Sequence, residues 1–397
     1  MVKVMRFLYE LAVECASLPI LLLAVVGARY RDRPYDVGIG PEPIVSHPHH
    51  RKALERRGYR TQTFVGSVYF ITEEFDVRGD RWWLARFRLL RPLASVALFV
   101  LAVWRYRCVY HYFNGGPLGS RWIFLWRFEP HLLRLAGVAT VVMPYGGDIQ
   151  DLTRTRNLLF KDAMARDYPA FRLRRRRVAA QIDLWTRHAS HLIGGCDWVE
   201  YLYHWDTLML AHFSIDLEEW HPLPAPPAAP GAPLRVLHAP NHRHIKGSAH
   251  VVAAVERLRA EGVLIELTLL EAVPNTRVRE AIAEADVVVD QLVIGWYAMF
   301  ALEAMAMEKP VLCHLRPDFL QFYVDAGLVA EGEIPLIDTR PGTIEDDLRR
   351  LAATDREHLR EIGRRSRAFA ARHHSLDAVG EVFDRVNRAA GVVPHGG

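Results

Sequence analysis

The strongest chemical signal in this 397-residue sequence is a basic loop, APNHRHIKGS, at positions 239–248. We expect a strand at 234–238 just before it and a helix that begins on its glycine. Arg243, Lys246 and the free amides at the start of that helix would then face one point, where they could bind a phosphate. Asn241 lies in the same loop. The alternative is a solvated basic loop, and the spacing excludes the GxxxxGK[ST] phosphate loop.

Lys246 is one of only five lysines in a chain that has 45 arginines. Such a skew is typical of a GC-rich genome, in which arginine replaces lysine wherever either cation serves. The remaining lysines could therefore mark sites where a compact ammonium group fits better than the planar fork of a guanidinium group.

A carboxylate in an apolar helix is the second signal. We expect a strand at 286–289, a turn through Gly295, and a helix over 298–307 that carries Glu303 among apolar residues. A buried glutamate needs a partner. The two hydroxyls of a ribose could supply one, because a carboxylate accepts both protons. The alternative is a glutamate on the helix surface.

Two glycine-containing turns follow strands in the first half of the chain. Tyr145-Gly146-Gly147-Asp148 follows an expected strand at 140–144, and Asn114-Gly115-Gly116 follows one at 108–113. Paired glycines let a backbone approach a ligand closely. Asp148 could hold a sugar hydroxyl or position an acceptor, and the alternative is that it caps the next helix.

Strands alternate with helices of about ten residues, which predicts an α/β fold with parallel sheets. Ligands of such sheets bind beyond the carboxyl ends of the strands. The loops at 114–116, 145–148, 239–247 and 290–297 all follow expected strands. These loops are therefore the candidate ligand sites.

A segment with six prolines, HPLPAPPAAPGAPL, divides the chain in two. We expect a first domain over 1–222, a linker over 223–233 and a second domain over 234–397, whose last helix could return to the first domain. Residues 1–222 hold 30 Lys and Arg against 22 Asp and Glu, whereas the rest hold 20 against 24. This asymmetry suggests two domains with different partners.

Apolar runs at 11–26 and 92–104 are short for a membrane-spanning helix of about 20 residues, and Glu14 interrupts the first. We interpret both as core or interfacial helices. Arg51 to Arg177 holds 24 cations and 10 anions, which would attract an anionic membrane surface. The basic cluster at 172–177 is either a solvated face or a contact for lipid phosphates. The scattered cysteines argue against a disulfide framework and a structural zinc site, and we find no nucleic-acid-binding motif.

The motifs together resemble the GT-B glycosyltransferases of family 4. Residues 236–247 are similar to the family's strand and loop that end in Lys-Gly, and Lys246 matches the lysine that binds the donor diphosphate. Residues 295–303 resemble the E-x7-E segment, with Gly295 in place of the first glutamate and Glu303 matching the second. Asp148 matches the aspartate of the acceptor-domain HGxD turn. The resemblance implies two Rossmann-like parallel-sheet domains that face each other across a cleft.

The function we expect is transfer of a sugar from a nucleoside diphosphate sugar to a lipid-linked or cell-envelope glycan. The resemblance implies retention at the anomeric carbon, no metal and no cofactor. We expect a cytoplasmic protein, at the inner face of the membrane if it contacts lipid. The alternatives are a sugar-nucleotide epimerase of the same fold and a non-catalytic sugar-nucleotide-binding protein. The expected catalytic residues are Asp148, Lys246 and Glu303; the expected donor-binding residues are Asn241, Arg243, Lys246, Gly247, Gly295, Tyr297, Ala298, Met299 and Glu303; and those on the acceptor side are Asn114, Gly115, Gly146, Gly147 and Asp148.

Overall fold

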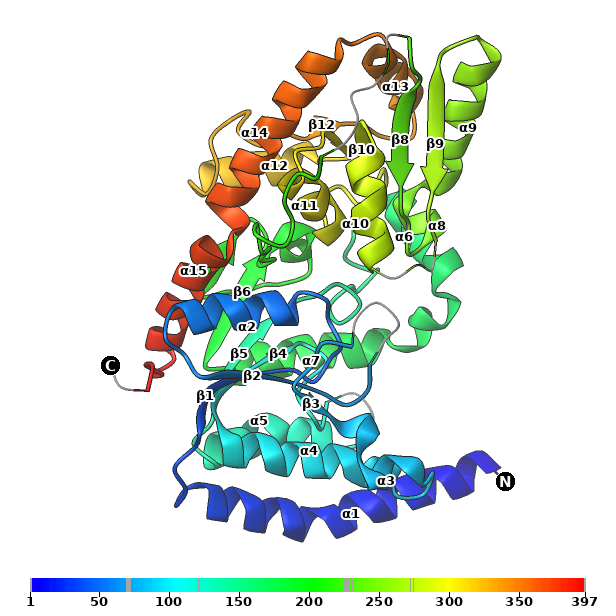
Figure 1. The fold of residues 1–397 in the computed structure, drawn as a ribbon. Helices are drawn as coiled ribbons and strands as arrows, with labels where there is room; N and C mark the ends of the chain where they lie inside the picture. Colours follow the sequence, from blue (N-terminus) through cyan, green and yellow to red (C-terminus); the bar gives the residue numbers. More distant parts are fainter. Residues whose placement is uncertain are drawn as a thin grey trace. The chain divides into compact units, whose positions relative to one another are not determined.

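The structure is a computed structural model that describes residues 2–68, 73–119, 122–224, 229, 231–271, 273 and 275–395. Part of the expected linker, at 225–228 and 230, lies outside the described residues. The chain divides into two compact units, each with its own parallel sheet (Figure 1). The first unit comprises 1–151, 175–208 and 379–397, and the second comprises 152–174 and 209–378.

The first unit is built on a seven-stranded sheet in the order β3-β2-β1-β4-β5-β6-β7. Neighbouring strands from β3 to β6 pair in parallel, for example Val37 opposite Cys108. This order places β1 and β4 at the centre, and the loops that follow them share one edge of the sheet. The strands are β1 (Tyr35–Ile39), β2 (Thr61–Val65), β3 (Val77–Arg78), β4 (Tyr106–Tyr112), β5 (Ala139–Met143), β6 (His191–Gly195) and β7 (Thr207–Met209).

Helices α4 and α5 cover one face of this sheet, and α1 lies over them as an outer layer (Figure 1). The last helix of the chain also joins the first unit, where Phe383 packs against His50 and Tyr110. The helices of this unit are α1 (Val2–Ala28), α2 (His47–Arg56), η1 (Gly79–Arg81), α3 (Trp83–Arg86), α4 (Arg91–Arg105), α5 (Leu125–Leu135), α7 (Arg175–His188), η3 (Cys196–Glu200) and most of α15 (Leu376–Ala389).

Glu14 explains why a charge interrupts the apolar run of α1. Its carboxylate is buried and accepts hydrogen bonds from the backbone amides of Ile123, Phe124 and Leu125, the last two at 2.9 and 3.0 Å. These are orphan amides at the start of α5, so Glu14 caps a helix distant in sequence. By length and composition the stretch Val4–Ala28 could cross a bilayer, although a third of its most apolar window is buried in the unit.

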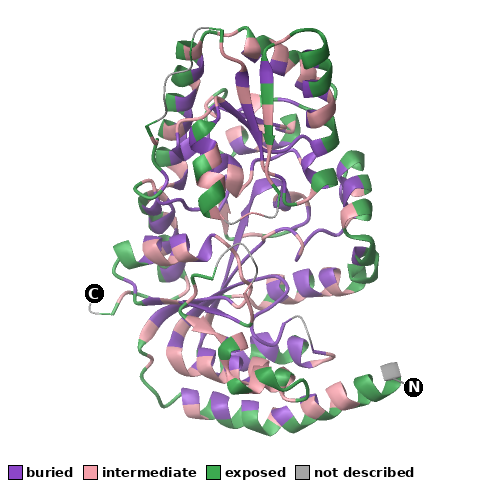
Figure 2. Cartoon of the chain, turned by 45° about the vertical axis from the view of Figure 1, so that its right-hand side comes forward, coloured by how far each residue is buried: buried purple, intermediate pink, exposed green. Residues whose placement is uncertain are grey.

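The second unit carries a five-stranded parallel sheet in the order β12-β11-β10-β8-β9. Its strands are β8 (Leu234–His238), β9 (Ile265–Leu269), β10 (Val287–Val289), β11 (Val311–Cys313) and β12 (Ile337–Asp338). Its helices are α6 (Leu158–Asp167), η2 (Pro169–Leu173), α8 (Arg243–Lys246), α9 (Ser248–Ala260), α10 (Asn275–Glu284), α11 (Met299–Ala306), α12 (Pro317–Asp325), α13 (Ile344–Ala352) and α14 (Arg356–His374). The strands are mostly buried (Figure 2).

The expected strands of both units lie within a residue or two of the observed ones, and the α/β fold class is confirmed. The division of the chain differs from the expected one. Residues 152–174, from the first half, belong to the second unit because α6 packs on α8. The chain passes to the second unit after Leu208 rather than after residue 222, and it returns to the first unit at Val379.

Candidate functional site

A buried ion pair lies at the carboxyl edge of the second sheet. The ammonium group of Lys246 is 2.6 Å from Oδ1 of Asp290, and both side chains are at least nine-tenths buried. Asp290 directly follows β10, and β10 pairs with β8, whose following loop carries Lys246. Because β8 and β10 are parallel neighbours, the residues that follow them meet at the same edge of the sheet, and the two charges come together there.

Gly247 sets the position of Lys246. It lies between the single turn of α8 and the start of α9 with φ of +75°, a left-handed conformation that suits glycine. A Cβ at this position would lie 3.0 Å from Cβ of Leu292. The amide of Leu292 donates to the carbonyl of Lys246 at 3.2 Å. The loop after β10 is thus packed directly against the lysine turn.

Asp290 also holds the start of α11. Its second oxygen, Oδ2, accepts a hydrogen bond from the backbone amide of Ala298 at 3.1 Å. One carboxylate therefore fixes the lysine and the N-terminus of a helix relative to each other. The first amides of α11, from Met299 onward, have no partner within the helix. A cation and a helix N-terminus gathered in this way form an anion-binding arrangement.

Glu303 projects from the same helix and is only 5% exposed. Its Oε1 lies 3.3 Å from the side-chain amide of Asn275, at the start of α10. Burial raises the pKa of Glu303 to about 8, with the hydrogen bond from Asn275 and the charge of Lys246 opposing this rise and the negative charge of Asp290 adding to it. The carboxyl group is therefore largely protonated at pH 7, and it lies within electrostatic range of the ion pair.

Gly295 adopts a conformation that other residues avoid. Its φ is +100°, and a Cβ there would lie 2.5 Å from Cγ of Arg316. Arg316 is stacked over Phe319 and is paired with Asp318. Gly295 stands where family 4 has its first glutamate. The space that a side chain would take there is filled by Arg316, from the loop after β11.

Arg243 is exposed and forms a forked ion pair with Glu271, in which its Nε lies 2.6 Å from Oε1. This pairing lowers the pKa of Glu271. Asn241 is exposed in the same loop. The guanidinium group of Arg243 therefore binds Glu271 and does not contact the Lys246–Asp290 pair.

Tyr297 lies in the core of the second unit. Its ring stacks on Trp296, and its hydroxyl is 2.9 Å from Nε2 of His374. Nδ1 of His374 lies 3.1 Å from the carbonyl of Phe213, so it donates there and Nε2 accepts from the tyrosine. The side chain of Tyr297 is therefore engaged in packing, and only its backbone borders the start of α11.

The segment 152–174 forms hydrogen bonds with the loop that carries Lys246 and with the loop after β10. Asp167 accepts hydrogen bonds from Nδ1 of His244 at 2.6 Å and from the amide of Ile245 at 3.0 Å. Asn157 caps α6 and donates to the carbonyl of Val293 at 2.6 Å. Sequence reasoning missed both residues, because they precede the loops they support by more than 70 positions.

Asp148 has no exposed surface in the first unit. Its carboxylate accepts three backbone hydrogen bonds of 2.9 to 3.0 Å, from Phe113, Tyr145 and Gly146. Burial raises the pKa of Asp148 to about 7 against the lowering effect of these bonds. The carboxylate thereby joins the turn after β5 to the end of β4, and Gly147 continues the same turn.

The neighbouring turn after β4 is equally compact. Gly115 has φ of +101°, and a Cβ there would lie 2.6 Å from Cα of Gly119. Glu129 of α5 is buried beneath this turn and accepts from the amide of Leu118 at 2.8 Å. Burial raises the pKa of Glu129 to about 8. Asn114 donates to Oε1 of Glu42 at 2.5 Å, which ties the turn to the loop after β1.

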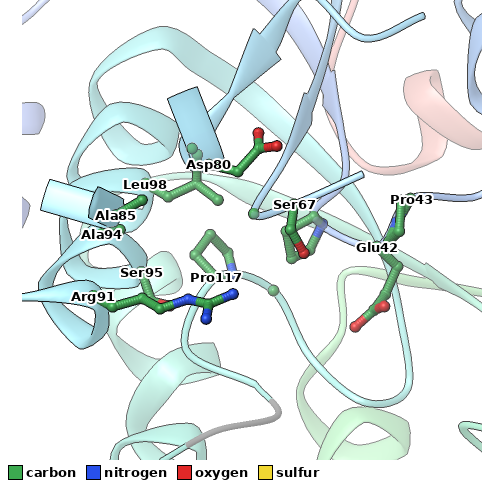
Figure 3. A pocket seen from close by; sticks show the side chains of 14 residues that line it. Glu42, Pro43, Ser67, Asp80, Ala85, Arg91, Ala94, Ser95, Leu98 and Pro117 are labelled. Atoms are coloured by element: carbon green, nitrogen blue, oxygen red, sulfur yellow. The ribbon is translucent and has the colours of Figure 1, made fainter. Parts of the chain in front are cut away.

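A cavity of about 420 Å³ opens at this edge of the first sheet (Figure 3). Glu42 and Arg91 provide charged groups on its walls, and Gly116 and Pro117 of the β4 turn complete it. Arg91 forms no ion pair with any described residue. The cavity is lined by Pro41, Glu42, Pro43, Gly66, Ser67, Gly79, Asp80, Ala85, Arg91, Ala94, Ser95, Leu98, Gly116 and Pro117.

The donor-side residues are thus brought together only in part. Lys246, Gly247, Ala298, Met299 and Glu303 share the edge of the second sheet, whereas the side chains of Arg243 and Tyr297 point elsewhere. Asp290 is the main residue that sequence reasoning missed. Its signal was visible, since an aspartate directly after a buried strand lies where ligands bind. Among the described residues, no group of three His, Cys, Asp or Glu side chains could hold a metal ion.

No protein-family model and no curated protein sequence match this chain. Solved structures do match it over nearly their whole length. HepE from Anabaena, solved with UDP, has 11% identity and a TM-score of 0.55, covering 89% of this chain and all of that one. Sucrose-phosphate synthase from Thermosynechococcus elongatus has 15% identity and a TM-score of 0.55, covering 90% and 98%. The chain has the GT-B fold.

The catalytic domain of starch synthase IV from Arabidopsis thaliana, solved with ADP and acarbose, matches in the same way. It has 10% identity and a TM-score of 0.54, and the match covers 91% of this chain and all of that one. The GT-B resemblance of the sequence is therefore confirmed at the level of the fold, and membership of family 4 stays a prediction.

Proposed function

We propose that this protein is a glycosyltransferase that transfers a sugar from a nucleoside diphosphate sugar to a glycan or lipid-linked acceptor. The observation that carries the proposal is the pair of hydrogen bonds that the Asp290 carboxylate accepts, one from Lys246 and one from the amide of Ala298. One carboxylate places the ammonium group of Lys246 and the first amides of α11 at the same edge of the second sheet, with Glu303 on the same helix. The GT-B structures solved with UDP and ADP support it further.

Lys246 and the N-terminus of α11 would stabilise the leaving group. Cleavage of the bond between the sugar and the diphosphate leaves a developing negative charge on the β-phosphate. An ammonium group that is already positioned by Asp290 lowers the energy of that charge without reorganising at the moment of reaction. Lys246 has three N–H donors, and Asp290 uses one of them. The other two remain for phosphate oxygens, and no metal ion is required in this scheme.

Glu303 would hold the ribose. Its carboxylate, once ionised, can accept hydrogen bonds from the two ribose hydroxyls, and Asn275 would orient it.

Arg243 would bind phosphate only after exchanging Glu271 for the ligand. The backbone at Gly295 and Tyr297 would border the transferred sugar. Because Arg316 fills the space beside Gly295, this enzyme would handle the donor sugar without a carboxylate at that position, and we keep retention at the anomeric carbon as part of the proposal.

The acceptor would bind in the first unit. The cavity beside Glu42 and Arg91 lies at the carboxyl edge of the sheet, where ligands of parallel sheets bind. We assign Asp148 a positioning role there, because its three backbone hydrogen bonds hold the turns that border Asn114, Gly115 and Gly146. We further propose a cytoplasmic enzyme that works at the inner face of the membrane.

The test measures release of nucleotide by purified protein from a panel of UDP-, GDP- and ADP-sugars, with and without membrane lipid extract. Release that depends on the extract, and that Lys246→Ala and Glu303→Ala abolish, supports the proposal. Lys161→Ala provides a matched control, because Lys161 is a half-buried lysine of the same unit on α6. It should leave turnover unchanged.

Two outcomes would overturn the assignment. Binding of nucleotides without turnover on any donor would leave a sugar-nucleotide-binding protein, which the absence of a glutamate at Gly295 makes a meaningful alternative. A change in the configuration of the donor sugar without any acceptor would instead identify an epimerase.

A further inference from the structure

Helix α1 has two long seams at helical spacing, and only the inner one is covered. The inner seam comprises Glu14, Ser17, Leu21, Ala24 and Ala28, all of them at most 4% exposed. It packs on α4 and α5. Trp104 of α4 donates to the carbonyl of Ala24 at 2.8 Å, and Glu14 caps α5. The helix is therefore fixed along the surface of the first unit rather than detached from it.

The outer seam is exposed and carries no charge. It comprises Leu8, Ala12, Cys15, Pro19, Leu22 and Val26, with Leu23 beside it at 73% exposure. A solvent-facing helix normally shows polar residues on its outer face. Here the only charge between residues 11 and 28 is Glu14, and it lies buried on the inner face. A helix that faced only water would carry its charged residue outside and its apolar residues inside, so the exposed apolar seam indicates a binding partner.

A second exposed apolar group adjoins the first half of α1. Trp83, Phe87 and Leu89 are 62%, 57% and 68% exposed, around α3 and the turn that follows it. The hydroxyl of Tyr9 donates to the carbonyl of Leu89, which places this group beside α1 (Figure 1). We call these two adjoining groups together the α1–α3 surface. Exposed apolar side chains that gather in one region of a protein mark interaction sites.

Arginines border the α1–α3 surface. Arg81, Arg86, Arg88 and Arg91 are exposed and fall within the eleven residues 81–91, a stretch that contains no acid. Arg29 and Arg31 lie exposed at the other end of α1. Arginines at the rim of an apolar face that includes an exposed tryptophan are complementary to an anionic lipid bilayer, whose headgroups are negative and whose interior is apolar.

We propose that the α1–α3 surface binds the face of an anionic bilayer, with α1 lying in the plane of the membrane rather than crossing it. Glu14 supports the in-plane orientation, because a helix whose carboxylate caps α5 cannot leave the globular unit without exposing those amides. This deepens the proposed function: Ala85, which lies between Trp83 and Phe87, and Arg91, which follows them, line the cavity assigned to the acceptor. A lipid-anchored acceptor would then reach the cavity from the bilayer. Membrane binding itself does not depend on the transferase activity.

Cys15 provides a built-in reporter. It lies in the middle of the outer seam and is the exposed cysteine among four, all within the described part of the chain. Burial raises the pKa of the Cys108, Cys196 and Cys313 thiols, which keeps them unreactive. A water-soluble maleimide should therefore label Cys15 selectively. We expect its rate to fall at least tenfold with vesicles of phosphatidylcholine and phosphatidylglycerol, and to change little with phosphatidylcholine alone. Cys15→Ser should abolish the signal.

Vesicle flotation of the full chain gives the second measurement. The double variant Leu8→Glu, Leu23→Glu should lose at least nine-tenths of the bound fraction. Both side chains are exposed, so the fold should tolerate the change, and an unaltered melting temperature would show it. Leu264→Glu is the matched control, since Leu264 is 61% exposed in the second unit. Arg86→Gln with Arg88→Gln should reduce the preference for anionic vesicles.

Failure of the wild-type chain to float with anionic vesicles would overturn the proposal, as would unchanged flotation of the Leu8→Glu, Leu23→Glu variant. If light scattering shows a dimer that Leu23→Glu dissociates, and vesicles do not protect Cys15, the surface belongs to a second copy of the chain instead. Nucleotide release from a soluble acceptor is measured separately, so loss of the transferase proposal would not be confused with loss of this one.

Discussion

The two matched motifs, around Lys246 in the second unit and Asp148 in the first, use their buried charges in opposite ways. Lys246 and Asp290 neutralise each other and still leave donors on the lysine for a ligand. Asp148 instead directs its oxygens to three amides of its own chain. A residue that matches a motif can thus act on a substrate or hold the loops that do. The contacts of its charged atoms decide which.

The sharpest test of this contrast is a double-mutant cycle on the ion pair. Lys246→Met should reduce turnover by about 100- to 1000-fold, because the leaving group loses its cation. It should also cost roughly 3–5 kcal/mol of unfolding free energy, because Asp290 is left buried without its partner. Adding Asp290→Asn should recover stability but not turnover. Denaturant unfolding and steady-state kinetics on the same samples measure both quantities.

Recovery of turnover in the double variant would contradict a role for Lys246 at the reacting phosphate. It would reduce the pair to a structural contact like that of Asp148.

Asp148→Asn should show the opposite pattern. The amide that replaces one oxygen cannot accept from the backbone, so buried donors lose a partner at a cost of about 1–3 kcal/mol in unfolding free energy. The affinity for nucleotide, measured by calorimetry, should stay within twofold of the wild type. A large loss of nucleotide affinity with normal stability would place Asp148 at the substrate and remove the contrast.

The pH dependence of nucleotide binding should report on Glu303. Its pKa of about 8 in the empty site means that it is largely protonated at pH 7. A ribose diol requires the ionised form, so binding releases a proton. The affinity should therefore rise with pH and level off above pH 8, changing by up to about tenfold per unit below it. Calorimetry in two buffers of different ionisation enthalpy measures the released proton.

Glu303→Gln should bind more weakly and lose the pH dependence. If the glutamine variant keeps the wild-type slope, the proton comes from another group and Glu303 does not hold the ribose.

The smallest effect is expected at Arg243. Because this exposed side chain is already paired with Glu271, Arg243→Gln should change nucleotide affinity by no more than about threefold, in line with the modest value of surface ion pairs. Glu271→Gln frees the arginine and should tighten binding slightly. A hundredfold loss in Arg243→Gln would show that the loop rearranges and that this arginine is part of the anion site.

Much of the fold and part of the site could be predicted from the sequence. Short apolar runs bounded by glycine and proline predicted the strands, and loops after strands predicted where Lys246 and Glu303 would lie. Pairings across the sheet could not be predicted, since Asp290 meets Lys246 only when β10 neighbours β8. The role of Glu14 could not be predicted either. A charge in an apolar run reads as an interruption of the helix, and nothing local reveals the α5 amides that it caps.

Asp167 and Asn157 have a consequence for how this protein can be divided. They support the lysine loop, yet they precede the linker that separates the halves of the sequence. A fragment that begins at residue 234 would contain the complete second sheet but lack these supports. The same holds for recombination between relatives, because an exchange at the proline-rich segment leaves residues 152–174 behind. The second unit is built from two separate stretches of the chain, 152–174 and 209–378, and a working chimera must carry both.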